Sequence, residues 1–291
     1  MKMDKMSSQP SFIYYGLANI QKSCIIYLNK TYTLTKKGSR RYMENSKINR
    51  TWLGITVIFL LFIFQQFASK IGSLVADSFN YSTIDEYDVF ARISVHHIVQ
   101  MLIGLLAIII LSKIYSIDFG FHFGNKNLGI KSVKIFSIAI LIYTVILYLF
   151  GYFTNNIPRY GYPLNLKNVL GSLGFQLFLS GPSEEVLFRA LPISIITYFI
   201  NSDKERKIAK RNISSVSIVC AILFSVAHIR WTINPFSISM DYFQLIYSLI
   251  LGIIYGNVYQ KSRSVIYPMI MHSIGNVIMV GFWIIFEFVS K

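Results

Sequence analysis

The sequence predicts an all-α membrane protein, a polytopic transmembrane helical bundle of about seven spans, within a range of six to eight. Of its 291 residues, 54% are hydrophobic and only 14% are charged, and the mean hydropathy is +0.51. A soluble globular protein is roughly a quarter charged. The apolar residues also gather in long runs, which are typical of membrane spans rather than of a single packed core.

Seven apolar runs are the expected helices. A helix rises ~1.5 Å per residue, so about 20 residues cross the ~30 Å hydrocarbon core. The longer runs can each span the membrane, and the two shortest can do so if flanking residues join them. In chain order, the runs cover residues 52–69, 97–111, 133–153, 169–200, 214–227, 242–259 and 264–289.

The fourth run, 169–200, has Gly181 and Pro182 near its middle. It fits either one long helix, kinked at Pro182, or a tight hairpin of two helices. A hairpin would move the basic segment 201–212 to the outer side of the membrane, so one crossing is favoured. Glu184 and Glu185 then lie roughly 23 Å of helix from the cytoplasmic end, at membrane depth.

The charged residues between the runs predict the orientation. The segment between the first two runs is acidic, whereas residues 201–212 carry five Lys or Arg and the first fifty residues carry ten. Cytoplasmic segments are enriched in Lys and Arg, so we expect a cytoplasmic N-terminus and no cleaved signal peptide. A bacterial plasma membrane is the expected location, with anionic lipid as a partner at the cytoplasmic face. No nucleic-acid partner is expected, because no aromatic-interleaved basic module accompanies the +15 formal charge.

We interpret the chain as three segments. Residues 1–50 form a basic cytoplasmic N-terminal segment, residues 51–168 hold N-terminal transmembrane helices and loops, and residues 169–291 hold the remaining spans. The two cysteines, Cys24 and Cys220, have no framework spacing, so no disulfide is expected.

Three polar clusters interrupt the apolar pattern in the third segment. Ionisable residues are costly in hydrocarbon and usually face the interior of a helical bundle. In each cluster two residues lie four apart, on one face of a helix: Glu185 and Arg189, Phe224 and His228, and His272 and Asn276. The clusters are Glu184-Glu185 with Arg189, Phe224 with His228, and His272 with Asn276.

The spacing suggests a division of labour between the two glutamates. Arg189 can neutralise Glu185, which leaves Glu184 to face a cavity beside His228, where a carboxylate and an imidazole could deprotonate a water. Hydrogen-bond donors on His272 and Asn276 could stabilise an oxyanion. No Ser or Cys lies in a comparable context. The clusters therefore indicate amide hydrolysis by an activated water, without a covalent intermediate.

Each cluster alone also fits a structural role. A Glu–Arg pair can hold a helix against its neighbours, and His and Asn commonly form hydrogen bonds between membrane helices. Their joint occurrence in three spans favours the catalytic interpretation. His96 and His97 form a second pair at the outer border of the second span, beside the acidic loop, and we expect both to be interfacial and solvated.

In order and spacing, the three clusters resemble the motifs of the CAAX prenyl protease and bacteriocin-processing (CPBP, or ABI) family of intramembrane proteases. The family pattern is Glu-Glu-x-x-x-Arg, Phe-x-x-x-His and His-x-x-x-Asn, and the resemblance covers roughly 169–289. It implies a CAAX-protease-like helical fold with a cavity at membrane depth, and marks 169–291 as the catalytic region. One departure is Ala190, where the family commonly has glycine after the arginine, which bears on local helix packing.

The resemblance also implies a role for each residue. Glu184 would be the general base with His228, His272 and Asn276 would surround the oxyanion, and Glu185, Arg189 and Phe224 would support them. Two histidines and a glutamate also resemble a zinc set. Because an H-E-x-x-H pair is missing and Asn276 is a poor zinc ligand, we favour a glutamate-type enzyme without a cofactor, and leave a metalloprotease open.

The expected function is an intramembrane endopeptidase that acts on a membrane-proximal peptide or protein substrate. The many Ile, Asn, Lys and Tyr residues suggest a low-GC bacterium, so bacteriocin processing, peptide-signal processing or self-immunity is the expected context. The alternative is a non-catalytic membrane binding or immunity protein. A proton-coupled transporter is less favoured, because neither a repeated half nor paired broken helices are evident.

Helix lengths leave one inconsistency in this site. Measured along ideal helices, Glu184 and His228 lie about 21 to 24 Å from the cytoplasmic ends of their spans. His272 lies only about 12 Å from that end if its helix begins at Ser264. Misplaced boundaries, helix tilt or a helix that restarts at Pro268 would each reconcile these depths.

Overall fold

The computed structural model describes residues 50–154, 160–200, 205–208, 211–233 and 235–289. The chain divides into two compact units, Met1–Leu53 and Gly54–Lys291. Of the first unit, the structure describes only the first turn of a helix. The expected cytoplasmic segment 1–50 therefore lies almost entirely outside the described residues.

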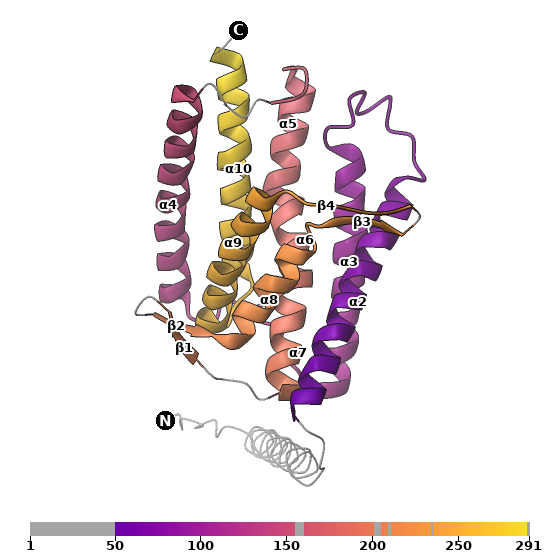
Figure 1. The fold of residues 1–291 in the computed structure, drawn as a ribbon, viewed down its shortest axis with the longest axis vertical. Coiled ribbons are helices and arrows are strands. Elements are labelled where there is room, and N and C mark those ends of the chain that lie inside the picture. Colours follow the sequence, from indigo (N-terminus) through magenta and orange to yellow (C-terminus); the bar gives the residue numbers. More distant parts are fainter. Residues whose placement is uncertain (1–49, 155–159, 201–204, 209–210, 234, 290–291) are drawn as a thin grey trace, which may run out of the picture. The chain divides into compact units, whose positions relative to one another are not determined.

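The fold is mostly helical, and the predicted polytopic membrane architecture is confirmed (Figure 1). Five helices are long and apolar enough to cross a membrane. They are α2 (Arg50–Ala76), α3 (Ala91–Tyr115), α4 (Lys126–Phe153), α9 (Tyr242–Ser262) and α10 (Ile266–Val289). The first four contain the predicted runs and extend them at one or both ends, whereas α10 begins two residues after the start of the run 264–289.

The run that carries the two glutamates is one continuous helix and not a hairpin. Its consecutive parts are α5 (Leu166–Phe175), the π-helical segment η1 (Gln176–Ser180), α6 (Gly181–Glu185), the π-helical segment η2 (Val186–Ala190) and α7 (Leu191–Ile200). The junction residues keep right-handed helical φ and ψ angles. Pro182 has no N–H to donate, and the widened π turns on either side accommodate that lost helical hydrogen bond.

The run 214–227 differs from the prediction. Its helix, α8 (Ser215–Val226), has 12 residues, which rise only ~18 Å and do not cross a membrane. The flanking residues do not extend it because they form strands. β1 (Glu205–Ile208) pairs with β2 (Arg211–Ser214), and β3 (Arg230–Ile233) pairs with β4 (Phe236–Ser239), both antiparallel. The two hairpins are an addition to the expected all-α fold.

Small residues bring the helices of the site into close contact. A Cβ atom on Gly181 of α6 would lie 2.9 Å from the backbone nitrogen of Ser273 on α10. A Cβ atom on Gly252 of α9 would lie 2.9 Å from Ala221 on α8. Side chains larger than hydrogen would separate these helices. Ala190 is fully buried in η2.

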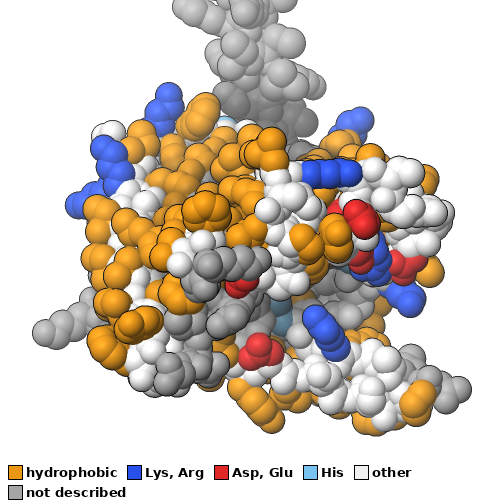
Figure 2. All heavy atoms as spheres, turned by 90° about the horizontal axis from the view of Figure 1, so that it is seen from above, with side chains coloured by type: hydrophobic (Ala, Val, Ile, Leu, Met, Phe, Trp, Pro, Cys, Tyr) orange, Lys and Arg blue, Asp and Glu red, His pale blue; other side chains and the backbone are white. Residues whose placement is uncertain are grey.

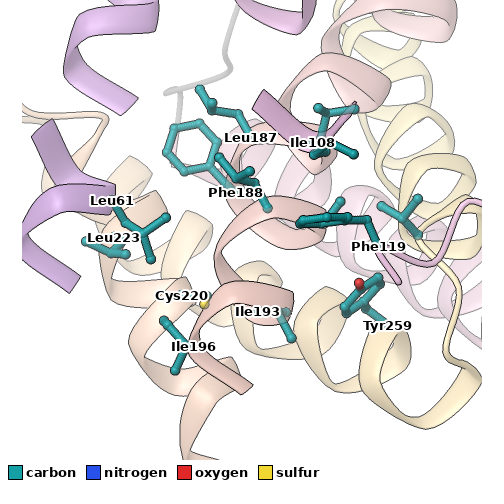
Figure 3. Packing of buried hydrophobic residues seen from close by; sticks show 14 of the residues in the cluster. Leu61, Ile108, Phe119, Leu187, Phe188, Ile193, Ile196, Cys220, Leu223 and Tyr259 are labelled. Atoms are coloured by element: carbon teal, nitrogen blue, oxygen red, sulfur yellow. The ribbon is translucent and has the colours of Figure 1, made fainter. Parts of the chain in front are cut away.

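The hydrophobic core lies where η2 and α7 meet their neighbours (Figure 3). Leu187 and Phe188 of η2 contribute to a cluster with Leu61 of α2, Ile108 of α3 and Cys220 of α8. Cys220 is a free, buried cysteine, and Cys24 lies outside the described residues. Large apolar side chains are also exposed along the long helices, where lipid would contact them. Seen from above, much of the surface is apolar as well (Figure 2).

The segment 116–125 connects α3 to α4 and contacts the turn between α9 and α10. The backbone N–H of Val265 donates to the Gly120 carbonyl at 2.9 Å, and the N–H of Asn125 donates to the Ser262 carbonyl at 2.8 Å. Figure 1 shows α7 continuing below this turn. In this view α10 begins above the lower end of α7. A short length of α10 therefore reaches His272 at the same height at which a longer length of helix, counted from the end of α7, reaches Glu184.

Candidate functional site

The three polar clusters meet in the structure through His272. From α10, its Nδ1 atom lies 2.8 Å from Oε1 of Glu185, and its Nε2 atom lies 3.6 Å from Oε2 of Glu184. A carboxylate oxygen only accepts, so Nδ1 carries the hydrogen and donates to Glu185. His272 therefore bridges the two adjacent glutamates.

Glu185 forms a buried ion pair with Arg189. Nη1 of Arg189 lies 3.0 Å from Oε1 of Glu185, and neither side chain is exposed. The guanidinium carbon also lies 4.0 Å from the ring centroid of Phe224 and 5.4 Å from that of Tyr255. Charged groups are buried only when paired, and the aromatic faces add cation–π attraction. Glu185 is thus held by Arg189 and His272, as expected for a supporting residue.

Glu184 is the more accessible of the two carboxylates. Its side chain is 18% exposed, whereas that of Glu185 is not exposed at all. Adjacent residues on a helix point about 100° apart, which turns Glu184 away from Arg189. Two neighbouring carboxyl groups with different surroundings are a common arrangement at acid–base sites. This difference agrees with the expected division of labour between the two residues.

His228 lies just beyond the end of α8. Its Nδ1 atom is 2.8 Å from the Phe224 carbonyl, and its ring packs edge-on against Phe224 with centroids 4.9 Å apart. The carbonyl only accepts, so Nδ1 is protonated and a neutral His228 keeps a lone pair on Nε2. Because α8 ends at Val226, His228 lies in a turn and not on a helical face.

The contact of Glu184 differs from the pairing that the sequence suggested. The imidazole beside its carboxylate is that of His272. Helical spacing describes positions within one helix, whereas this contact depends on how α6, α8 and α10 pack. The expected role of His228 in holding the water stays a prediction.

Asn276 lies one turn after His272 on α10. Its Nδ2 atom donates to Oγ of Ser180 in η1 at 3.0 Å. An amide NH2 group has two hydrogens, so one remains for another acceptor. The expected contact of Asn276 with an oxyanion likewise stays a prediction.

The expectation for His97 was wrong. Its side chain is buried, its Nδ1 atom is 2.6 Å from Oγ of Ser183, and its ring lies edge-on to Phe175. Because α3 begins at Ala91, His97 lies well inside the helix and not at its border. His96 is only half-buried and contacts Ser73 of α2 at 3.2 Å. The sequence did contain a signal for a buried histidine here. Adjacent residues on a helix point about 100° apart, so two adjacent histidines in an apolar run must face different neighbours.

Tyr255 is another residue of the site that the sequence analysis missed, and it has no sequence signal. It is fully buried on α9, and its ring centroid lies 5.3 Å from that of His272. Its position next to both His272 and Arg189 follows from the packing of α9 against α8 and α10. A tyrosine in an apolar run resembles any other core or interfacial residue.

The described side chains do not form a zinc-type ligand set. Among them, no three His, Cys, Asp or Glu side chains are grouped so that they could hold a metal ion. Glu185 is committed to Arg189 and His272, and the Asn276 amide is committed to Ser180. No catalytic step is therefore assigned to a metal.

In Figure 2, histidine surface is visible near the middle of the upper face, between acidic side chains. Residues 166–278 match the family model described as Rce1-like, type II CAAX prenyl endopeptidase Rce1-like. The matched region begins with α5, ends within α10 and contains all three polar clusters. No curated protein and no solved structure matches the chain.

Proposed function

Because residues 166–278 belong to the type II CAAX prenyl endopeptidase Rce1-like family, we propose that this protein is an intramembrane endopeptidase in which Glu184 activates the attacking water. The observation that carries the proposal is the different state of two neighbouring carboxylates. Glu185 is buried against Arg189, whereas Glu184 is partly exposed beside an imidazole. Only Glu184 is free to take a proton from water.

The proposed reaction needs no covalent intermediate. Glu184 takes one proton from water while the water oxygen attacks the carbonyl carbon of the scissile bond. The lone pair on Nε2 of His228 accepts a hydrogen bond from the same water. The carbonyl π electrons move to oxygen, and the resulting oxyanion accepts from the free Asn276 hydrogen and from His272 when its Nε2 is protonated. The C–N bond then breaks, and Glu184 returns the proton to the amine.

The substrate is proposed to be a lipidated or membrane-anchored peptide. Exposed apolar side chains along the long helices suit a protein that lies in a membrane, so a substrate that is itself held in the membrane shares its surroundings. The family description names prenylated CAAX peptides. Bacteriocin or peptide-signal processing and self-immunity, in a bacterial plasma membrane, remain the proposed biological context.

The test uses purified protein in lipid nanodiscs with an internally quenched peptide that ends in a CAAX sequence. The same peptide is compared with and without a farnesyl group on its cysteine. We expect the wild type to cleave the farnesylated peptide, and Glu184→Gln to lower kcat by at least about 100-fold, because the general base is lost. His228→Gln should also lower kcat.

Thermal unfolding of both variants controls for misfolding. Unchanged cleavage by a folded Glu184→Gln variant would remove the proposed base. Cleavage of the unmodified peptide at an equal rate would remove lipidation from the substrate class. If the folded Glu184→Gln variant confers the same phenotype on cells as the wild type, a non-catalytic binding or immunity protein becomes the better account.

The same assay separates a glutamate mechanism from a metalloprotease. A glutamate-type enzyme should keep its activity after dialysis against a chelator. Stoichiometric zinc in the purified protein, together with loss of cleavage on its removal, would contradict a metal-free mechanism.

A further inference from the structure

We infer that His97 is a positioning residue of this site, and that it acts through Ser183 on the helical turn that carries Glu184. The inference rests on the proposed function, because it assigns a role within the same site. His97 lies on α3 and is 8% exposed, and Ser183 lies on α6 and is not exposed. Their Nδ1 and Oγ atoms are 2.6 Å apart. Ser183 directly precedes Glu184 in the chain.

The hydrogen bonds around Ser183 give this contact a direction. The Ser183 hydroxyl donates its one hydrogen to the Ser180 carbonyl at 3.0 Å. Its oxygen must then accept from His97, so the hydrogen of the imidazole is on Nδ1 and the lone pair is on Nε2. His97 is neutral in this form and adds no fixed positive charge to the turn that carries Glu184.

This part of the helix needs support from its neighbours. Pro182 lacks the N–H that would donate to the preceding turn, and π-helical segments lie on both sides. Two serines flank the weakened turn. Ser183 accepts from His97 of α3, and Ser180 accepts from Asn276 of α10 at 3.0 Å. The turn that carries Glu184 is thus held by a buried hydrogen bond from α3 and a partly buried one from α10.

His96 provides a matched control for His97. It is the same residue type, it is adjacent in α3, and its Nδ1 atom also contacts a serine, Ser73 of α2, at 3.2 Å. A Cβ atom on Gly72 would lie 3.1 Å from the same imidazole nitrogen, so His96 packs against α2 and not against α6. The His96 ring also lies edge-on to the His97 ring, with centroids 5.3 Å apart, so a leucine at position 96 keeps a side chain beside His97 and leaves both partners of the Ser183 bond in place.

The kinetic test compares His97→Leu, His97→Asn, Ser183→Ala and His96→Leu with the farnesylated quenched peptide. We expect His97→Leu and Ser183→Ala to lower kcat about tenfold, the rate equivalent of one hydrogen bond, with KM within about twofold. His97→Asn should recover most of the rate, because its amide can donate to Ser183 from nearly the position of Nδ1. His96→Leu should leave both constants unchanged.

A second measurement does not depend on activity. Nitrogen-15 NMR of histidine-labelled protein in nanodiscs reports the tautomer of each of the five histidines. The signal that disappears in His97→Asn identifies His97. We expect its Nδ1 to be protonated in the wild type, and we expect this preference to be lost in Ser183→Ala, which removes only a hydroxyl and should fold.

Three results would overturn the inference. They are an equal loss of kcat in His96→Leu and His97→Leu, a His97→Asn variant as slow as His97→Leu, and a His97 protonated on Nε2. A wild type that cleaves neither peptide would instead remove the proposed function. The tautomer measurement would then decide alone whether Ser183 orients His97.

Discussion

Arg189 is the fully buried cation at the centre of the site, and its environment predicts how the protein responds when it is removed. Arg189→Met would leave the Glu185 carboxylate buried without its partner. We expect the free energy of unfolding to fall by about 3–5 kcal/mol. Glu185→Gln combined with Arg189→Met should be more stable than Arg189→Met alone, because no unpaired charge remains. Thermal unfolding in one detergent measures both.

An exposed ion pair in the same chain is the control for this prediction. Arg92 lies 2.6 Å from Asp77, with side chains 42% and 51% exposed. Arg92→Met should change the free energy of unfolding by no more than about 1 kcal/mol. Equal effects of Arg92→Met and Arg189→Met would contradict the account of burial given for the site.

At this scale, the sequence predicts contacts within one helix better than contacts between helices. The pairing of Glu185 with Arg189 follows from a spacing of four residues along one helix, and Phe224 packs on His228 at the same spacing although His228 lies in the turn after α8. The contacts of His272 with Glu184 and of His97 with Ser183 join residues far apart in the chain. No local periodicity encodes such a distance, and a wrong helix start was enough to misplace His97.

At the scale of elements, the close approach of α8 and α9 places His228 relative to the rest of the site. Gly252→Ala would put a Cβ atom 2.9 Å from the Ala221 backbone, so the two helices must separate. We expect a loss of about 1–3 kcal/mol in the free energy of unfolding, and a lower kcat because His228 moves with α8. Thermal unfolding and the quenched-peptide assay measure the two effects.

Gly174 of α5 offers the opposite case. A Cβ atom there meets nothing within 4 Å. Gly174→Ala should therefore keep or raise the free energy of unfolding, by up to about 1 kcal/mol, since alanine favours a helix more than glycine does. The interpretation of the α8–α9 contact fails if the two alanine variants behave alike.

The observed helices also show which sequence patterns were sufficient to predict where a helix lies. Long apolar runs predict where α2, α3, α4, α9 and α10 lie, because lipid demands continuous apolar helix. The same signal misjudged α8, since fourteen apolar residues fit a short helix inside a bundle as well as a membrane span. The π-helical segments arise from packing around Pro182 and leave no periodic signal.

For the whole molecule, the distribution of charge predicts which side of the membrane each loop faces. In a chain with Cys24→Ser and Cys220→Ala, single cysteines can replace Ser82, in the acidic loop between α2 and α3, or Asn127, at the start of α4. Both positions are exposed. A membrane-impermeant maleimide should label Ser82→Cys in intact cells, because the acidic loop lies outside.

The same reagent should label Asn127→Cys only after the membrane is permeabilised. The opposite pattern would place the N-terminus outside and would contradict the orientation derived from the Lys and Arg residues. Labelling of both positions in intact cells would indicate leaky membranes and is excluded by a control with a cytoplasmic protein.

The hydrogen bonds between segment 116–125 and the α9–α10 turn show that the site depends on residues outside the region that matches the family model. The family model matches residues 166–278. Hydrogen bonds to the backbone of Gly120 and Asn125, which lie outside that range, hold the turn from which α10 begins. They thereby set the height of His272 and Asn276. The region that matches the family model is therefore smaller than the region that positions the site. A chimaera that received residues 166–278 alone would contain the three polar clusters but would lack segment 116–125, which helps to position them.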